Sequence, residues 1–173
     1  MEDQLKFVFQ NVNEWLKHAE TKCATLLAAN GLAIFGLVRL GVAWQEMPTS
    51  AFVYGLIAVT LLLASMVSLM VSFSPSLQMP WLFKKNSPDA TDNLIFFSHI
   101  AKYTPKRYCE SLSKSLSKTE EKITDFEIQL ANQIIANSVI ADRKYAFFRF
   151  SIWITISAII SPLGAWLVWR SAH

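Results

Sequence analysis

Three long apolar segments dominate the hydropathy pattern of this chain. They cover residues 24–43, 52–73 and 150–169, and Arg39 is the only charged residue inside them. A bilayer core of about 30 Å needs about 20 apolar residues in helical form, and strands would leave backbone groups unpaired in lipid. The pattern therefore predicts an all-α integral membrane protein, with three transmembrane helices and a helical cytoplasmic region.

The segments outside the spans complete this organisation. Residues 1–23 are expected to form an amphipathic helix that leads into the first span, because Leu5, Val12 and Ala19 recur at helical spacing. About twenty polar or amphipathic residues precede the first apolar segment, so we expect a retained anchor and no cleavable signal. The other segments are a short periplasmic loop at 44–51, the cytoplasmic region at 74–149 and a periplasmic C-terminal stub at 170–173.

Basic residues predict the orientation. Eleven Lys and Arg residues lie between the second and third spans and three precede the first span, whereas residues 44–51 contain none. Because positive residues near span ends are retained in the cytoplasm, the N-terminus is expected inside and the C-terminus in the periplasm. The net charge of +3 is then a topology signal, and the basic residues are too mixed with acidic ones to predict a nucleic acid partner.

Composition bears on the main structural alternative, a soluble helical protein with three buried core helices. The chain is 53% hydrophobic and 17% charged, which is far from the usual profile of a small soluble domain. The membrane interpretation is therefore favoured. Arg39 lies about one turn from the outer end of its span, where it either extends to the lipid headgroups or takes part in gating.

Small and weakly polar residues recur on one face of each span. Such residues allow helices to pack closely, and their hydroxyls bond between helices. The alternative is a polar pathway in an oligomer, since three helices from one chain are too few to surround a wide channel. This predicted membrane polar face comprises Asn30 in the first span, Ser65, Ser68 and Ser72 in the second, and Ser157 and Ser161 in the third.

The cytoplasmic region is expected to contain a short helix over residues 94–100 and then a long one. Thr104 and Pro105 are typical of a helix start, and the helix is predicted to continue from Lys106 into the third span. Its seam either joins copies in a homo-oligomer or packs against residues 5–23 of the same chain. The seam positions are Leu116, Thr119, Ile123, Phe126, Leu130, Gln133, Asn137 and Ile140.

Three groups of residues resemble the signatures of a bacterial membrane family, the Pycsar transmembrane effectors. The first group is Trp15, Ala19, Glu20, Lys22 and Cys23, followed by Leu26, Leu27, Asn30 and Gly31. The second is Asn93, Phe96, Phe97, His99 and Ile100, and the third is Gln133, Ile134, Ser138, Ile140, Ala141, Asp142, Lys144 and Tyr145. The resemblance covers nearly the whole chain, although Glu20 replaces the usual Asp and Cys23 the usual Ala.

This resemblance implies antiphage defence by an effector of the bacterial inner membrane. In that family a partner pyrimidine nucleotide cyclase makes cyclic CMP or cyclic UMP upon infection, and the effector then impairs the membrane. The infected cell dies before phage are released, which is abortive infection. The resemblance implies a cyclic pyrimidine nucleotide as the activating ligand, and the lipid bilayer is the second partner.

Candidate ligand-binding or coupling residues lie near the inner ends of the first and third spans. A cyclic phosphate favours Lys or Arg, and a base stacks on aromatic rings such as Trp15, Tyr108 or Tyr145. Gln133 and Glu20 are candidates for base or ribose contacts. The phosphate candidates are Lys22, Arg143 and Lys144, with Asp142 beside them. The alternative is that these charges only hold helix ends at the membrane surface.

Catalysis is not predicted. His18, His99 and His173 are far apart, and no metal motif, P-loop or Ser-His-Asp pattern is present. The protein is therefore expected to be no enzyme and to hold no cofactor. The competing function is a membrane anchor or sensor subunit that recruits a soluble partner through its cytoplasmic helix.

Overall fold

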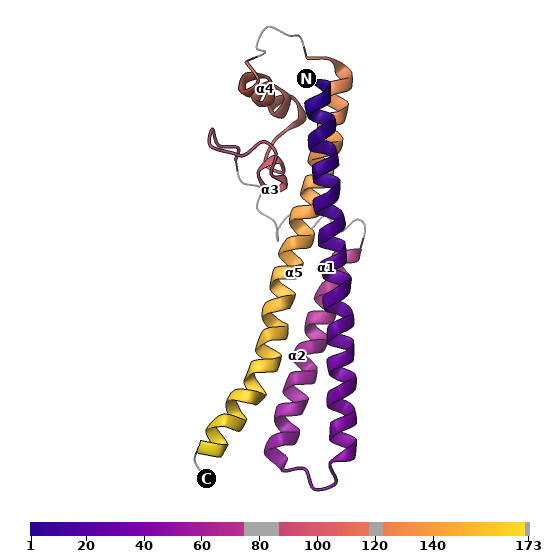
Figure 1. The fold of residues 1–173 in the computed structure, drawn as a ribbon, viewed down its shortest axis with the longest axis vertical. Coiled ribbons are helices and arrows are strands. Elements are labelled where there is room, and N and C mark those ends of the chain that lie inside the picture. The colour runs from indigo at the N-terminus through magenta and orange to yellow at the C-terminus, as the bar shows by residue number, and fades with distance from the viewer. Residues whose placement is uncertain (75–86, 118–122, 172–173) are drawn as a thin grey trace. The chain divides into compact units, whose positions relative to one another are not determined.

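The computed structural model describes residues 1–74, 87–117 and 123–171, and for residues 162–171 it describes the helix but not the side chains. Within these ranges the chain is helical and contains no strand (Figure 1). The elements are α1 (Glu2–Ala43), α2 (Thr49–Phe73), α3 (Phe97–Ile100), α4 (Pro105–Ser115) and α5 (Asp125–Ser171). The all-α class is therefore confirmed for the described residues.

The chain divides into two compact units. Unit 1 consists of Met1–Glu20 and Ser76–Tyr145, and unit 2 consists of Thr21–Pro75 and Ala146–His173. Helices α1 and α5 each contribute residues to both units. The predicted amphipathic helix and first span are thus parts of one helix, since α1 runs from Glu2 to Ala43.

Unit 2 is a bundle of helical segments. In Figure 1, α2 runs alongside the second half of α1, and the last turns of α5 diverge from both. Cys23 and Leu26 of α1 and Leu69 of α2 form a buried apolar cluster. Helix α2 begins at Thr49, three residues before the predicted span, and ends with it at Phe73.

Two of the described helices, α1 and α2, are long and apolar enough to cross a membrane. Only 11% of the apolar window of α1 and 28% of that of α2 is buried, whereas a core helix of a soluble protein would be mostly buried. These two helices are consistent with a helical membrane protein. The third predicted span, 150–169, is not among the helices found; it lies in α5, and its side chains from residue 162 onward fall outside the described part.

Unit 1 has a hydrophobic core built from four helices. Leu5, Val8 and Val12 of α1 are at most 2% exposed, and they pack with Ile134 of α5 and Tyr108 of α4. The apolar stripe predicted for residues 1–23 therefore faces this core. The helix expected over residues 94–100 is shorter, since α3 has a single turn, but its Phe97 and Ile100 are buried as expected.

The predicted unbroken helix from Lys106 into the third span is wrong. Helix α4 ends at Ser115, Ser117 has a positive φ of 56°, and α5 begins at Asp125. Thr124 starts α5 through a capping box, because its backbone N–H donates to Glu127 Oε2 (2.9 Å) and Glu127 N–H donates to Thr124 Oγ1 (3.3 Å). The predicted start of α4 at Pro105 is confirmed, although Thr104 makes no side-chain capping bond.

The predicted seam is only partly buried in the packed helix. Leu130 packs against the core, and Asn137 Nδ2 donates to Asn13 Oδ1 at 2.7 Å. Phe126, Gln133 and Ile140 are exposed instead. The packing against residues 5–23 uses Ala131, Ile134, Ser138 and Ala141, one residue further along, which turns the buried face by about 100°. Thr119 lies outside the described residues.

Candidate functional site

An aromatic cluster in unit 1 brings together three segments of the chain. The Trp15 ring of α1 lies 5.6 Å from Phe97 and 6.2 Å from Tyr145 of α5, measured between centroids. Phe97 and Tyr145 are stacked at 5.1 Å with an interplanar angle of 20°, and Phe96 contacts both Trp15 and Phe97. Trp15 and Tyr145 are half-buried, so each ring retains accessible surface.

An ion pair lies next to this cluster in sequence. Lys144 Nζ is 3.2 Å from Glu20 Oε1, and the Lys144 side chain is only 10% exposed whereas that of Glu20 is 51% exposed. Glu20 follows Trp15 on α1, and Lys144 precedes Tyr145 on α5. Trp15, Glu20, Lys144 and Tyr145, all predicted from sequence, therefore belong to one unit and are joined in pairs between the same two helices.

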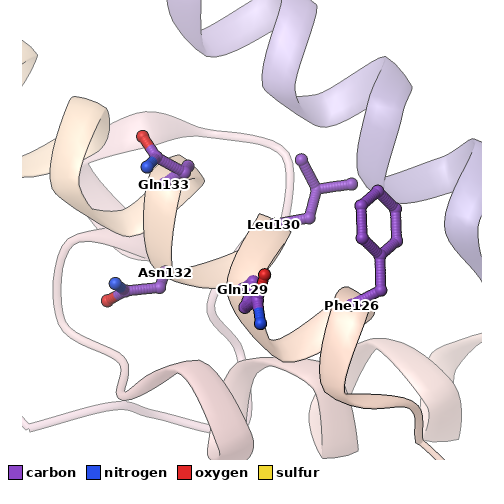
Figure 2. Close-up of a pocket in the computed structure, with 5 residues that line it drawn as sticks. All are labelled: Phe126, Gln129, Leu130, Asn132 and Gln133. Carbon is purple, nitrogen blue, oxygen red and sulfur yellow. The ribbon is translucent and has the colours of Figure 1, made fainter.

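The other predicted ligand residues are placed differently. Asp142 and Arg143 are half-buried on α5, just before Lys144. Lys22 is exposed and belongs to unit 2. Gln133 is exposed and lies twelve residues before Tyr145, about 18 Å along the helix. It lines a hollow of about 330 Å³ with Phe126, Gln129, Leu130 and Asn132 (Figure 2).

Tyr108 cannot present a ring face to a base in this structure. Its side chain is fully buried, and its hydroxyl donates to the Leu94 carbonyl at 2.7 Å. Burial also raises the pKa of Tyr108 well above its usual value. This residue supports the loop before α3, so the stacking role considered for it from sequence is wrong.

A polar loop holds Phe96 and Phe97 in the cluster. The Asp92 carboxylate accepts bonds from Lys102 Nζ (2.5 Å) and the Asp89 N–H (2.8 Å), while His99 Nδ1 accepts from the Asn93 N–H (2.8 Å). Burial alone would raise the pKa of Asp92, but the Asp89 N–H and the Lys102 cation outweigh it and lower the pKa below its usual value. The loop is thus fixed by a charged carboxylate.

Unit 2 contains a buried polar network that joins α1, α2 and α5. Asn30 Nδ2 donates to Ser65 Oγ (2.9 Å), and Thr155 Oγ1 donates to Asn30 Oδ1 (3.0 Å). Ser65 Oγ donates to the Ser151 carbonyl at 3.0 Å. Ser65 and Thr155 hydroxyls are also 3.0 Å apart, and since each carries one proton, this contact is an alternative to one of the other bonds.

The residues of the predicted polar face differ in their burial and in their hydrogen-bond partners. Asn30 and Ser65 are at most 1% exposed and bond within the chain. Ser68 and Ser72 of α2 lie on the same side, and their buried hydroxyl oxygens have no hydrogen-bond partner among the described residues. Ser157 and Ser161 are exposed and donate to carbonyls of their own helix, those of Trp153 and Ser157.

Sequence reasoning missed Ser151, Thr155, Phe96 and Phe97 as site residues. Ser151 and Thr155 are four residues apart, so they share a helix face, and Thr155 lies about 200° around the helix from Ser157. The spacing of Ser151, Thr155 and Ala158 was the available signal, since all three are buried. Phe96 and Phe97 were predicted only as members of the second group of residues that resembles the family, and not as part of the site.

No cluster of three or more His, Cys, Asp and Glu residues that would hold a metal ion occurs among the described residues. Cys23 and Cys109 are both buried. Burial raises the pKa of Cys109 to about 11, which leaves its thiol protonated at neutral pH. The described part of the chain therefore offers aromatic rings, one buried lysine and hydroxyl groups as its ligand-binding chemistry.

Comparisons with known proteins show the family of this chain. The family model described as the Pycsar effector protein domain matches residues 4–171. The chain is similar to the Pycsar effector protein PtPycTM of Propioniciclava tarda, with 29% identity over 163 residues that cover 91% of this chain and 71% of the relative. No solved structure matches it. Because the family model spans nearly every residue of both units, the chain belongs to the Pycsar effector family.

Proposed function

We propose that this protein is an antiphage effector that responds to a cyclic pyrimidine nucleotide, cyclic CMP or cyclic UMP, made by a partner cyclase. Membership of the Pycsar effector family supports this role. The effector itself is non-catalytic and needs no cofactor. Its output is damage to the bacterial inner membrane, which ends in abortive infection.

The membrane part of the proposal rests on unit 2. Helices α1 and α2 expose large apolar side chains, such as Leu32 at 72%, Phe35 at 65% and Met70 at 62%, which is the surface that lipid requires. Residues 150–169 of α5 supply the third span. The basic residues place the N-terminus in the cytoplasm and the C-terminus in the periplasm, and several copies assemble to produce the lesion.

The pairing of Trp15 with Tyr145 and of Glu20 with Lys144 is the observation that carries the ligand site. The half-buried rings offer a stacking surface for a pyrimidine, and Lys144 offers a cation for the cyclic phosphate. In the resting protein Glu20 holds Lys144, so the phosphate competes with the Glu20 carboxylate. Ligand binding would then exchange a contact between α1 and α5 for a contact with the nucleotide.

Coupling follows from the two shared helices. Trp15 and Asn30 both lie on α1, and Tyr145 and Thr155 both lie on α5. A nucleotide shifts the equilibrium only if it binds two states with different affinity. The exchange of Glu20 for the phosphate at Lys144 supplies this difference in affinity. Separation of the spans would break the bonds of Asn30 with Ser65 and Thr155.

The test is nucleotide binding and membrane depolarisation in three variants. Lys144→Gln should lose both responses. Glu20→Gln should respond at a nucleotide concentration up to about fivefold lower, because an ion pair with an exposed partner contributes about 0.2–1 kcal/mol and that competition is removed. Lys114→Gln, which changes an exposed lysine of α4 in the same unit, is the control and should behave as wild type.

Two results would argue against the proposal. Wild-type binding in Lys144→Gln would remove Lys144 from the ligand site. A correctly inserted wild-type protein that binds neither cyclic nucleotide, and causes no depolarisation with either, would favour the partner-recruiting membrane subunit instead.

A further inference from the structure

Helix α5 of unit 1 carries an exposed face without charge. Between Phe126 and Ile140 the sequence has a single charged residue, Glu127, which is only 8% exposed because it turns inward to cap the helix. A run of fifteen helical residues therefore shows no charged side chain to solvent. An exposed helix of a soluble region is normally covered by charged and polar residues.

The other helices of the same unit provide the contrast. Helix α4 exposes Lys106, Arg107, Glu110 and Lys114 within eleven residues. The exposed side of α1 in unit 1 likewise carries acidic and basic residues, among them Glu2, Lys6, Glu14 and Lys17. The longer helices described in unit 1 thus expose charged residues where this stretch of α5 does not.

The exposed residues of this face recur at coiled-coil spacing. Phe126, Gln129, Gln133, Ala136 and Ile140, the α5 stripe, alternate by three and four residues and are all exposed. Phe126 is 54% and Ile140 44% exposed. Apolar and amide residues at these positions are typical of a helix seam, in which a polar member fixes register.

We propose that the α5 stripe is the surface through which two copies of this chain associate, with the two α5 helices parallel. Two observations favour a second copy over an unrelated partner. An uncharged face gives no electrostatic selection of a charged partner, and the Gln amides are both donors and acceptors, so they pair with their own kind. In a two-fold interface each residue then meets its equivalent.

The membrane supplies what so short a seam lacks. Residues 126–140 extend about 21 Å, two heptads, which is too short for stable association of free helices. Copies inserted in one membrane with the same orientation are already parallel and are held at high local concentration. The parallel orientation and high local concentration depend on the proposed membrane insertion, whereas the exposure of the α5 stripe does not.

Figure 2 shows five side chains along this part of α5. Phe126 and Leu130 point to the side where the α1 ribbon runs, and Asn132 points the other way. The hollow of about 330 Å³ lined by Phe126, Gln129, Leu130, Asn132 and Gln133 lies on this surface. A side chain from the second α5 would fill it, since knobs of one helix insert into holes of the other.

Charge exchange at Gln133 tests the proposal in the full-length chain. Two differently labelled copies are expressed in one membrane, and association is measured by energy transfer, with and without each cyclic nucleotide. Gln133→Lys with itself and Gln133→Glu with itself should each associate more weakly than wild type, by up to about fivefold. Mixed Gln133→Lys and Gln133→Glu copies should regain wild-type association.

The same substitutions at Gln10, an exposed glutamine of α1 in the same unit, are the matched control and should change nothing. Thermal unfolding of each variant verifies that it is folded. The proposal is overturned if wild-type copies do not associate under any condition, if like-charged Gln133 variants associate as wild type, or if the mixed pair fails to recover. Depolarisation is scored separately, so a failed interface with an intact nucleotide response leaves the proposed function standing.

Discussion

Replacing Asn30 with leucine should loosen the packing of α1 against α2 and α5. The Asn30 amide bonds to Ser65 Oγ at 2.9 Å and accepts from Thr155 Oγ1 at 3.0 Å, so Asn30→Leu removes two hydrogen bonds between helices. Leucine has a similar volume and leaves no large cavity. Ser65 still donates to the Ser151 carbonyl, which limits the cost of the lost partners.

The expected loss follows from the strength of such bonds. Hydrogen bonds between membrane helices contribute about 0.6 kcal/mol each on average, so two contribute about 1.2 kcal/mol. This corresponds to about a sevenfold change in the equilibrium between packed and separated helices. Under the proposed function, Asn30→Leu should also depolarise the membrane at a nucleotide concentration up to about sevenfold lower than wild type.

The assay is an SDS titration of the purified protein in detergent, with tryptophan fluorescence reporting the loss of helix packing. Ser157→Ala is the matched control, because the Ser157 hydroxyl donates only to the Trp153 carbonyl of its own helix at 2.9 Å. It should change the free energy of unfolding by less than about 0.5 kcal/mol. The reasoning is refuted if Asn30→Leu is as stable as wild type or if Ser157→Ala loses as much.

Three further predictions concern unit 1. Because the pKa of Asp92 is lowered in the folded protein, its contribution to the free energy of unfolding should be present at neutral pH and lost as the pH falls below about 4. The free energy of unfolding of Asp92→Asn should therefore depend less on acid pH than that of the wild type. An unchanged pH dependence would contradict this prediction. Thr124→Val should lower the free energy of unfolding by about 1 kcal/mol, with Thr124→Ser near wild type, since the capping bonds need the hydroxyl; equal stability of Thr124→Val in thermal melts would exclude that role. Cys109, whose pKa is raised to about 11, should resist iodoacetamide at pH 8 until the protein unfolds, and rapid labelling measured by mass spectrometry would show an open core.

The apolar pattern predicted the long helices well because burial or lipid contact imposes the same requirement at every position of a span. Helix α2 ends at Phe73 as predicted, and α1 joins the amphipathic stripe of Leu5 and Val12 to the first apolar segment in one helix. The third predicted span is not among the helices found, and the side chains of its residues from 162 onward are not described.

Local chemistry explains why the long cytoplasmic helix was mispredicted. Periodicity alone treated residues 106–150 as continuous, but Ser117 adopts a left-handed conformation and Thr124 with Glu127 forms a new helix start. The Thr-x-x-Glu spacing was readable in the sequence. Its significance depends on Glu127 turning inward, which shifts the buried face of α5 by one residue from the predicted seam.

For the candidate site, the sequence predicted how far along α1 and α5 the residues lie, but not which way their side chains point. Glu20 lies four residues before the first predicted span and Lys144 six residues before the third, so similar membrane depth favoured their proximity. Depth does not specify direction around a helix. Lys22 lies about 200° around α1 from Glu20, and it is Glu20 that contacts Lys144.

Helices α1 and α5 connect the proposed ligand site to the polar network. Nearly all of the Lys144 side chain is buried and its partner Glu20 is half-exposed, so under the proposed function an anion from solvent would take the place of the Glu20 carboxylate. Exchange of Glu20 for a phosphate would free α1 from α5 at that point. Under the proposed function, α1 and α5 continue as the helices that hold Asn30 and Thr155, so the bonds of Asn30 with Ser65 and Thr155 would oppose the separation that nucleotide binding favours.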